Sequence, residues 1–580
     1  MNFDVVNNTA SYPKAHVGGK SLKWRHLLAA PERDYVFKPH ERPMMPGSPA
    51  SPDHPTLRRV AYFVIGVTVG ITGGLGNALV SANTQNIQGS LGLYSNQIAW
   101  LPAAYIMTNV SMSLLLVKFR QQFGLVPFAR IFLPAFVAIT AAHLFIHTFA
   151  TALVVRAMSG IAASALSTLA LLYIMQSLPA SWRLKGIVLG IGIPQLTTPL
   201  ARMFSSDMLE RGQWTILYVF ELGLALVSLA MVFWLRLPPS ERMKAFEKLD
   251  FVTFALYAPG VALLCAVLSQ GRILWWTEVP WLGWALCASI LLLSAAILVE
   301  YNRANPLLNV RWMASRDIVR FALVAISVRL LLSEQSYGAF GLLQTLGMNN
   351  DQLIPLSTIM LLATIAGIAA SAITLNPLNL GRPVFWSVAL IAAGSFMDAD
   401  ASNLTRPAQM YLSQAMIAFA AVYFMGPTLL IGMLRALSKG PNHLVSFSAL
   451  FGITQSLGGL AGSALLGTFQ IMREKFHSHA IVQSIVATDP QVATRLQQLG
   501  GAYGKVVSDP TLRSAQGAAT LSQQVTREAN VLAFNDIFML VGFLAAFTLV
   551  WMGAKQVRMY ITGFNPMAEP LAAMARMRAQ

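Results

Sequence analysis

Five charged side chains lie inside long apolar stretches of this sequence. They are Arg156, Arg202, Glu221, Arg329 and Glu334. A charged group at bilayer depth costs from about 2.5 to more than 10 kcal/mol, so such groups persist mainly where they face a cavity or a partner. A carboxylate there can bind and release a proton, and a guanidinium group can bind an anion. These residues are therefore the first candidates for a functional site.

Glu221 allows three interpretations. It lies between Phe220 and Leu222 in a predicted span, where it can be a proton or substrate site, the structural partner of an arginine, or an interfacial residue of a misplaced span. Glu334 follows Arg329 by five positions, and five helical residues separate two side chains by about 140°. We expect one of these two to line a cavity and the other to meet a neighbouring helix.

Polar residues accompany the charged ones in two predicted spans. They are Asn77, Asn83 and Gln85 in the first span, and Gln335, Tyr337 and Gln344 in the ninth. Three arginines against two carboxylates make the predicted cavity net positive. We therefore predict an anionic or zwitterionic amphiphile as its ligand, such as an aromatic acid, a siderophore or an acidic antibiotic.

Signals for enzymatic or metal chemistry are weak. His143 and His147 stand at i and i+4, a spacing that can hold a metal, but no further Glu or His is near them in the sequence. We expect them to be interfacial polar residues. The sequence contains no Gly-x-x-x-x-Gly-Lys-Ser/Thr phosphate loop and no catalytic constellation. We therefore expect neither an enzyme nor a bound cofactor or metal.

Apolar helices must position these residues. A span needs roughly twenty mostly apolar residues to cross about 30 Å of hydrocarbon, and about fourteen stretches meet that length. The predicted starts lie near Arg59, Gln97, Pro127, Ala152, Lys185, Trp214, Asp250, Pro280, Ile318, Leu353, Arg382, Gln409, Leu444 and Ile537. With 55% hydrophobic and 11% charged residues and a mean hydropathy of +0.56, the chain is predicted to be an all-α integral membrane protein.

The net charge of +17 follows membrane topology. No basic stripe with interleaved aromatic residues is present, which argues against a nucleic-acid partner. If the N-terminus is cytoplasmic, the short outward loops carry only Arg211, Arg272 and Arg406. The inward loops then exceed them in Lys and Arg by about five to one, as the positive-inside rule requires. Both termini are therefore predicted to be cytoplasmic.

Two polar regions flank or interrupt the spans. Residues 1–57 lack the apolar core of a signal peptide and are predicted to form a disordered cytoplasmic tail. Residues 473–535 form a long outward segment, for which we expect partner docking, a lid role or disorder. Cys265 and Cys287 both lie in predicted spans, so neither a disulfide nor a thiolate metal site is expected.

Several short patterns together resemble one family. Arg156-Ala-Met-Ser-Gly160 resembles the Arg-x-x-x-Gly signature of the major facilitator superfamily. Asn305–Val310, followed by Ser315-Arg316-Asp317, resembles the connector before span nine in its fourteen-span branch of EmrB/QacA-type exporters. Met425-Gly426-Pro427 fits span twelve of the same branch. The resemblance covers residues 58–556 and implies that Arg156 takes part in proton transfer or its electrostatic control.

The sequence departs from the family pattern at three places. The loop Val117–Gly124 keeps the last glycine of a Gly-x-x-x-Asp-Arg-x-Gly pattern but has no acid. Thr198-Pro199 replaces Gly-Pro in span five, and Arg202-Met203 replaces the Gly-Gly that follows. Gly76-Asn77 stands where drug–proton exchangers carry an Asp. Proton coupling would therefore use the two carboxylates within the spans. The resemblance places gating motifs at Gly124, Gly160, Thr198 and Pro199.

The resemblance implies two six-helix bundles that rock around a central site, with two helices inserted between them. The N-terminal bundle would occupy 58–235, the connector with the extra helices 236–317, the C-terminal bundle 318–556 and a cytoplasmic tail 557–580.

The function implied is proton-coupled secondary export of amphiphilic small molecules across the inner membrane of a Gram-negative bacterium. The partners implied are substrate, protons, membrane lipids, a periplasmic membrane-fusion adaptor and an outer-membrane channel. Two alternatives stay open. One is an importer, or a specialised metabolite or siderophore transporter with different coupling. The other is a transporter-like sensor without turnover.

Overall fold

The computed structural model describes residues 41, 47–209, 215–303, 305–440, 443–486, 488–563 and 567–572. Most of the tail predicted at 1–57 lies outside these residues. So do Arg211, Trp214 and the last part, 573–580, of the tail predicted at 557–580.

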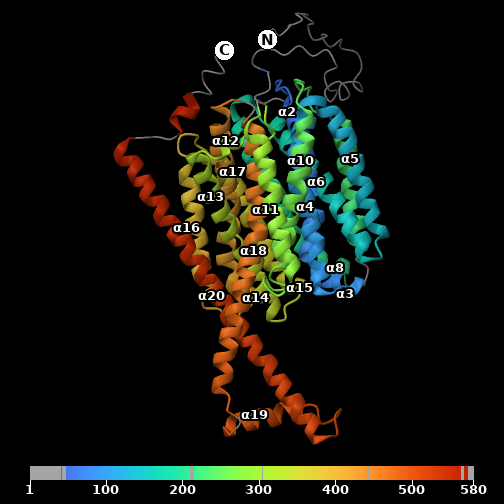
Figure 1. Ribbon diagram of the computed structural model, residues 1–580, viewed down its shortest axis with the longest axis vertical. Coiled ribbons are helices and arrows are strands. Elements are labelled where there is room, and N and C mark those ends of the chain that lie inside the picture. The colour runs from blue at the N-terminus through green and yellow to red at the C-terminus, as the bar shows by residue number, and fades with distance from the viewer. Residues whose placement is uncertain are drawn as a thin grey trace, which may run out of the picture.

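Eleven helices in the described part of the chain are long and apolar enough to cross a membrane. They are α2 (Thr56–Ala82), α4 (Ser95–Phe123), α5 (Leu125–Ala142), α6 (Phe149–Ser177), α9 (Thr215–Trp234), α10 (Lys248–Gln270), α11 (Pro280–Tyr301), α15 (Asn350–Ile373), α17 (Tyr411–Leu437), α18 (His443–Ser484) and α20 (Pro510–Thr562). A helix satisfies its backbone hydrogen bonds internally, as hydrocarbon requires. The chain is a multi-pass, all-α membrane protein (Figure 1).

Three predicted spans form interrupted or shorter helices and are not among the eleven. Their parts are α7 (Arg183–Gly192), η3 (Ile193–Leu196), α8 (Thr197–Leu209), α13 (Arg316–Leu331), η4 (Glu334–Ala339), α14 (Phe340–Thr345) and α16 (Gly381–Asp398). Pro194 stands at the break between α7 and α8, and η4 is a single π-helical segment. The count of fourteen spans therefore stays a prediction.

The predicted span starts agree with the helices except at the last one. Every other predicted start lies within three residues of a helix start. The span expected to begin near Ile537 lies inside a longer helix, because α20 begins at Pro510. Asp509 caps that start by accepting a hydrogen bond from the backbone N–H of Thr511 at 2.8 Å. Hydropathy detects only the apolar part of a helix, and the first half of α20 is polar.

Two large hydrophobic cores hold the helices together. One lies among α2, α5, α6 and α9 around Phe128 and Tyr173. The other lies among the helices from α13 to α20 around Phe340, Phe424 and Phe538. We call the helices from α2 to α9 the N-half and those from α13 to α20 the C-half. The division at 58–235 and 318–556 stays a prediction.

Helices α10 and α11 stand between the two halves. A separate core joins Leu114 of α4 and Val261 of α10 to Ala296 of α11 and Ala449 of α18. The inserted helix pair therefore contacts one helix from each half. Movement of the halves against each other would change this packing.

The polar segment 473–535 is helical. Helix α18 continues through it to Ser484, α19 (Pro490–Gly501) follows, and α20 returns from Pro510. Figure 1 shows these parts projecting well beyond the bundle, with α19 at the tip. Gly517 of α20 packs against the backbone of α19 at Leu496, with room for no side chain. We call residues 473–535 the projection.

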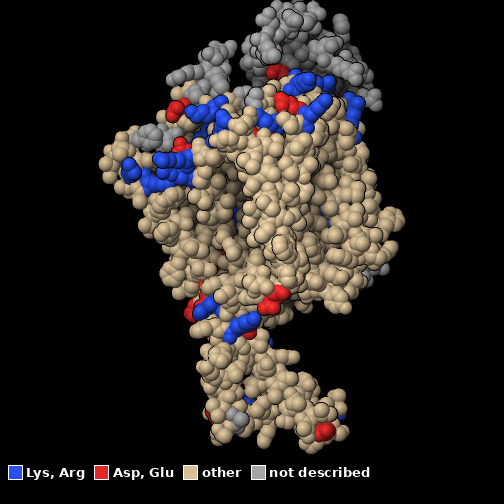
Figure 2. Space-filling model, in the orientation of Figure 1, with Lys and Arg blue, Asp and Glu red and all other residues tan. Residues whose placement is uncertain are grey.

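Charged residues mark the two ends of the bundle. We call the end at which α2 begins the terminal face, and the end that carries the projection the distal face (Figure 1). Figure 2 shows Lys and Arg gathered at the terminal face above a broad band almost free of charge. The band fits burial in hydrocarbon, and the asymmetry fits the positive-inside rule.

The tail predicted at 1–57 is not disordered throughout. Residues 47–54, which we call the strap, lie against the terminal face of the N-half. Ala50 is fully buried, its N–H donates to Pro239 O at 2.8 Å, and its carbonyl accepts from Gln176 Nε2 at 2.8 Å. His54 is also buried, with Nε2 3.0 Å from Gln176 Oε1. Backbone hydrogen bonds, invisible to hydropathy, order this segment.

Candidate functional site

A buried carboxylate and a buried guanidinium group meet at one turn of α2. Glu221 of α9 is 3% exposed, and its carboxylate lies so close to Gly76 that a methyl group there would overlap with it. Arg156 of α6 donates to Asn77 Oδ1 at 2.7 Å and to Gly76 O at 3.5 Å. Glu221 Oε2 has no hydrogen-bond partner among the residues that the structure describes. A carboxylate from α9 thus lies beside the Gly76-Asn77 turn of α2.

Aromatic groups surround this pair. The Arg156 guanidinium lies 5.0 Å from the centre of the Tyr105 ring of α4. His143 stacks on Tyr218 at 4.4 Å between ring centres, and its Nε2 lies 3.4 Å from Ser159 Oγ. Glu221 is therefore an interior residue, and its interpretation as an interfacial residue is wrong. Its roles as a proton site or as the partner of Arg156 stay predictions.

Arg202 reaches from the N-half to the C-half. Its guanidinium group lies 3.7 Å from the ring centre of Phe340, the first residue of α14. The side chain is 8% exposed, and within the described part of the chain both Nε and Nη1 lack a hydrogen-bond partner. A buried guanidinium group with unmet donors on an aromatic face can bind an anion.

The C-half holds a second buried network, built around an amide. Gln414 Nε2 of α17 donates to Glu334 Oε1 at 3.1 Å and to Asp398 Oδ2 at 2.8 Å. Ser413 Oγ donates to Asp398 Oδ1 at 2.5 Å, and Gln335 Nε2 donates to Gln414 O at 3.1 Å. Glu334 is fully buried, and its Oε2 has no partner. One amide thus bridges two carboxylates from different helices.

Sequence reasoning missed two members of this network. Asp398 is the last residue of α16, where an acid is read as the end of a span. Gln414 is a polar residue in the first turn of α17. Gln414 could have been found from its residue type, because an amide buried inside an apolar stretch needs hydrogen-bond partners.

Arg329 and Glu334 contact different helices, and the expectation that one of them lines a cavity stays a prediction. Arg329 Nε donates to Gln455 O of α18 at 3.0 Å, whereas Glu334 meets Gln414 of α17. Tyr337, in the same stretch as Glu334, lies 4.9 Å from the Arg272 guanidinium group, measured to the ring centre.

The remaining polar candidates are Asn83, Gln344 and Gln85. Asn83 Oδ1 accepts from Asn350 Nδ2 at 3.0 Å, a contact between α2 and α15 across the two halves. Gln344 lies half-buried on α14. Gln85 is exposed on α3 (Thr84–Leu91), and its assignment to the lining is wrong. The first span ends at Ala82, so the next turn belongs to another helix.

The predicted gating positions have different roles in the structure. Gly160 is the crossing point of α6 and α4, where a methyl group would overlap with the backbone of Tyr105. Gly124 ends α4 with a φ of +83° and lies beside Arg242. In the span-five motif Pro199 is buried but Thr198 is exposed. Thr197, one residue earlier, packs on Gly74 instead.

The loop that lacks an acid finds one on an inserted helix. Lys118 Nζ lies 2.7 Å from Asp250 Oδ2 of α10, and both side chains are buried. Arg303 lies 2.9 Å from the other Asp250 oxygen and 2.5 Å from Glu300. Arg303 also pairs with Glu247, and this hydrogen bond lowers the pKa of the Glu247 carboxyl. We call these residues the latch; it ties α4 to the inserted helices.

Comparisons with known proteins concern the fold. No family model and no curated protein sequence matches the chain. The chain is similar to the human organic anion transporter MFSD10 (TETRAN), with a TM-score of 0.50 and 14% identity, over 85% of this chain and 100% of that one. It is also similar to the nucleoside transporter NupG (TM-score 0.48, 10% identity, 85% and 99% covered). A third similar structure is the proton:xylose symporter XylE (TM-score 0.44, 14% identity, 84% and 95% covered). The chain has the major facilitator fold.

Proposed function

We propose that the chain is a secondary active transporter that exports a zwitterionic amphiphile in exchange for protons. The observation that carries the proposal is the buried Glu221 carboxylate, which keeps one oxygen without a partner beside Arg156. Such a group can exchange a proton for a cationic group. The major facilitator fold supports a transport role, and the fourteen-span exporter branch stays part of the proposal.

The direction in which protons move relative to the substrate determines which charge the substrate must carry. An anion bound beside Glu221 would hold the proton in place, because it adds negative charge, whereas a cationic group would displace the proton. Proton antiport therefore requires a positive group at Glu221. The unmet donors of Arg202 suit a negative group. A zwitterion with an apolar body against Phe340 satisfies both requirements.

Alternating access would proceed by rocking of the N-half against the C-half. Two contacts cross between them near the candidate site, Arg202 on Phe340 and Asn350 to Asn83. Neither contact is an ion pair, and both would have to break when the halves separate, together with close packing such as Gly192 on Ile368 and Val188 on Gly426. These contacts support a division at 58–235 and 318–556 with the inserted helices at 236–317.

The proposed location is the inner membrane of a bacterium, with the terminal face in the cytoplasm. The gathering of Lys and Arg at that face supports this orientation (Figure 2). The projection would then extend into the periplasm. There we propose that it binds a membrane-fusion adaptor, which would connect the transporter to an outer-membrane channel.

The test is proton release from purified protein in weakly buffered detergent solution. A panel of zwitterionic, acidic and cationic amphiphiles is added to the wild type, Glu221→Gln, Gly76→Ala and Glu278→Gln. The glycine variant displaces the Glu221 carboxylate without removing it, and Glu278 is an exposed control for the same substitution.

Release by a zwitterion that disappears in Glu221→Gln, falls in Gly76→Ala and persists in Glu278→Gln supports the proposal. Proton uptake on binding of acids would show cotransport and overturn export by antiport. Binding without any proton change would overturn proton coupling and favour a transporter-like sensor.

A further inference from the structure

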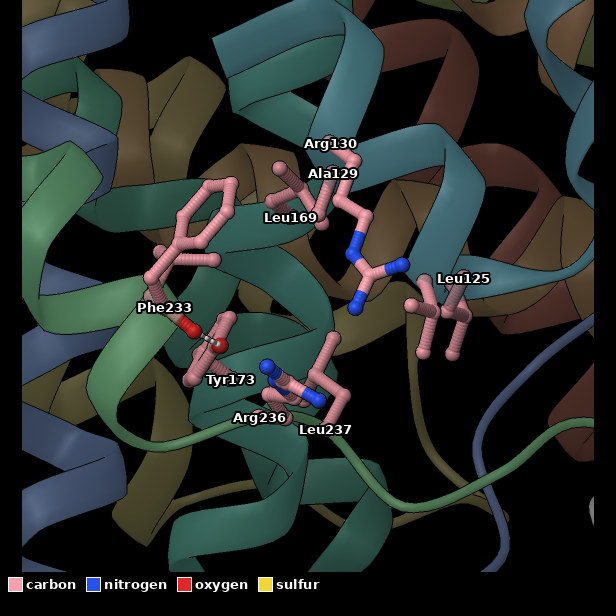
Figure 3. Close-up of a pocket in the computed structure, with 10 residues that line it drawn as sticks. Leu125, Ala129, Arg130, Leu169, Tyr173, Phe233, Arg236 and Leu237 are labelled. Atoms are coloured by element: carbon pink, nitrogen blue, oxygen red, sulfur yellow. Dashed lines mark hydrogen bonds between the residues drawn. The ribbon is translucent and has the colours of Figure 1, made fainter. Parts of the chain in front are cut away.

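A groove opens between helices of the N-half near the terminal face (Figure 3). Its walls come from α5, α6, α9 and the chain just after α9. The walls are mainly apolar, with Leu125, Ala129, Leu169, Phe233 and Leu237 among them. This groove lies apart from Glu221 and Arg202, which belong to the candidate site described above.

Two guanidinium groups stand at this groove. Arg130 lies on the second turn of α5, and Arg236 follows the end of α9. Both are exposed, and Figure 3 shows both side chains extending toward the same opening. Among the described residues neither has a carboxylate oxygen within 4.0 Å. The groove therefore offers two positive charges that no side chain of the described chain neutralises.

The backbone beside Arg236 is held firmly. Tyr173 OH donates to Leu235 O at 2.7 Å, and Tyr62 OH donates to Arg236 O at 3.1 Å. Both tyrosines are fully buried. Their hydroxyls donate to the carbonyls of Leu235 and Arg236, just beyond the end of α9, so neither hydroxyl hydrogen is left for a ligand in the groove. Among the described residues that line the groove, the two guanidinium groups are therefore the polar side chains left for a ligand.

The position of the groove along the bundle selects the ligand. Trp234, beside Arg236, is exposed at the end of α9, where an indole marks the membrane–water interface. Lys and Arg crowd the same face (Figure 2). A ligand there must combine an apolar chain that reaches into hydrocarbon with an anionic group at the interface. Lipids of the surrounding leaflet have this form.

We propose that this groove binds one anionic phospholipid of the terminal-face leaflet. The phosphate lies between Arg130 and Arg236, and an acyl chain lies along the wall formed by α5 and α9. Basic pockets between helices at a membrane interface are suited to such headgroups. The bound lipid would connect α5 to the chain after α9. The proposal is independent of the proposed transport function, because its test measures lipid and not flux.

The test is native mass spectrometry of the full chain after stepwise delipidation. The protein is supplied with phosphatidylglycerol and phosphatidylcholine of identical acyl chains. The variants are Arg130→Gln with Arg236→Gln, and a control, Arg316→Gln with Arg382→Gln. The control removes two exposed charges from helix ends in the C-half, outside the groove.

We expect the wild type and the control to retain one phosphatidylglycerol in preference to phosphatidylcholine. The groove variant should lose that preference by about tenfold or more, since each basic residue near the membrane contributes about 1 kcal/mol. A further variant, Ala129→Trp, fills the apolar wall and should weaken retention of both lipids. An unchanged preference in the groove variant would overturn the proposal. So would displacement of the lipid by inorganic phosphate alone, which would show a headgroup site without a chain.

Discussion

Gly160 determines how closely α4 and α6 can cross. Thr108 Oγ1 donates to Ala157 O at 2.7 Å, and Asn109 Nδ2 donates to Gly160 O at 3.1 Å. A methyl group on Gly160 would overlap with the backbone of Tyr105, which cannot move without separating the helices. We expect Gly160→Ala to lower the free energy of unfolding by about 1–3 kcal/mol. Thermal unfolding in detergent measures this.

Gly223 provides the control. It lies in α9, with open space where a methyl group would be placed. Gly223→Ala should therefore leave stability unchanged or raise it slightly, because alanine favours helix. If Gly160→Ala and Gly223→Ala lowered the free energy of unfolding equally, the close crossing at Gly160 would not contribute to stability.

Asp398 shares an amide with Glu334, and no basic side chain of the described chain forms an ion pair with either. Two carboxylates in such a site repel each other, so the pair is suited to holding one proton. We expect Asp398→Asn to lower flux driven by a pH gradient at least tenfold while the protein still folds and binds substrate. Flux in liposomes, with size-exclusion profiles beside it, measures this.

Asp400→Asn is the matched control, because Asp400 is exposed two residues further along the chain. Its flux should equal that of the wild type. Normal gradient-driven flux in Asp398→Asn would remove the C-half pair from the mechanism and leave Glu221 as the carrier candidate.

At the residue scale, charges within apolar stretches could be found from the sequence, because their cost implies interior partners. Arg156, Arg202, Glu221 and Glu334 all lie in the interior. Asp398 could not be found, since an acid at the end of a span is normally solvated. Gln85 was assigned to the wrong helix, because the break after Ala82 leaves no mark in hydropathy.

The strap contacts the terminal face through His54, which is uncharged in the folded state. The pKa of His54 is lowered from 6.5 to about 4, mainly by burial and further by Arg58 and Arg59, against the opposing hydrogen bond to Gln176. The folded state thus binds fewer protons than the unfolded state between these values. Docking is fully stable above pH 6.5, and stability on the order of 3 kcal/mol is lost as pH falls through 6.5 toward 4.

We therefore expect the strap to leave the terminal face in mild acid. A spin label on Ser51→Cys, in a Cys287→Ser background, should become mobile between pH 6.5 and 4. His54→Phe keeps a ring of similar size but cannot become charged, so its label should stay immobile. Mobility that is independent of pH in the wild type would show that His54 does not control docking.

The latch is an element-scale device, because it joins α4 to the inserted helices. Asp250 is fully buried between Lys118 and Arg303. Asp250→Asn would leave the buried Lys118 ammonium group without its carboxylate, whereas Arg303 would keep Glu247 and Glu300. Removing one partner of a buried pair costs about 3–5 kcal/mol. We expect Asp250→Asn to lower the free energy of unfolding by that amount. Thermal unfolding at low and high salt measures it.

Asp53→Asn is the contrasting variant. Asp53 is highly exposed and lies 3.8 Å from Arg59, and an exposed pair contributes at most about 1 kcal/mol. If both variants lost the same stability, the latch would not be a buried ion pair in the working protein.

Helix positions could largely be predicted, whereas helix interruptions and extensions could not. Apolar length alone locates a span, since hydrocarbon thickness sets it. The breaks at η3 and η4 depend on packing between helices, and the early start of α20 depends on a cap at Asp509 and on contact with α19. None of these features changes average hydropathy.

At the scale of the whole molecule, the order of the helices and the charge asymmetry indicate the fold. They do not determine which residues of the two halves contact each other. The contact of Arg202 with Phe340 joins residues far apart in the sequence. No local pattern encodes which helix faces which. The projection is a similar case, because its polar helices are ordered only by each other and by the bundle beneath them.

The projection is fixed to the bundle at its base. Asp536 of α20 lies 2.5 Å from Arg473 and 2.6 Å from His477 of α18. Farther out, apolar side chains are exposed to solvent, with Val506 at 85% and Leu512 at 60%. Exposed apolar groups outside the membrane mark an interaction surface. We infer that the adaptor proposed above binds here.

We expect Val506→Asp with Leu512→Asp to abolish co-purification of a membrane-fusion adaptor, because each carboxylate would be desolvated at the interface. Gln497→Asp with Gln498→Asp is the control: it adds the same charge to exposed positions of α19 without removing apolar surface. Membrane insertion and proton release on substrate binding should be unchanged in both variants, since α19 projects beyond the bundle (Figure 1) and Glu221 is buried within it. Loss of capture in the control as well would indicate a general charge effect. Capture retained by the valine–leucine variant would place the docking surface elsewhere on the distal face.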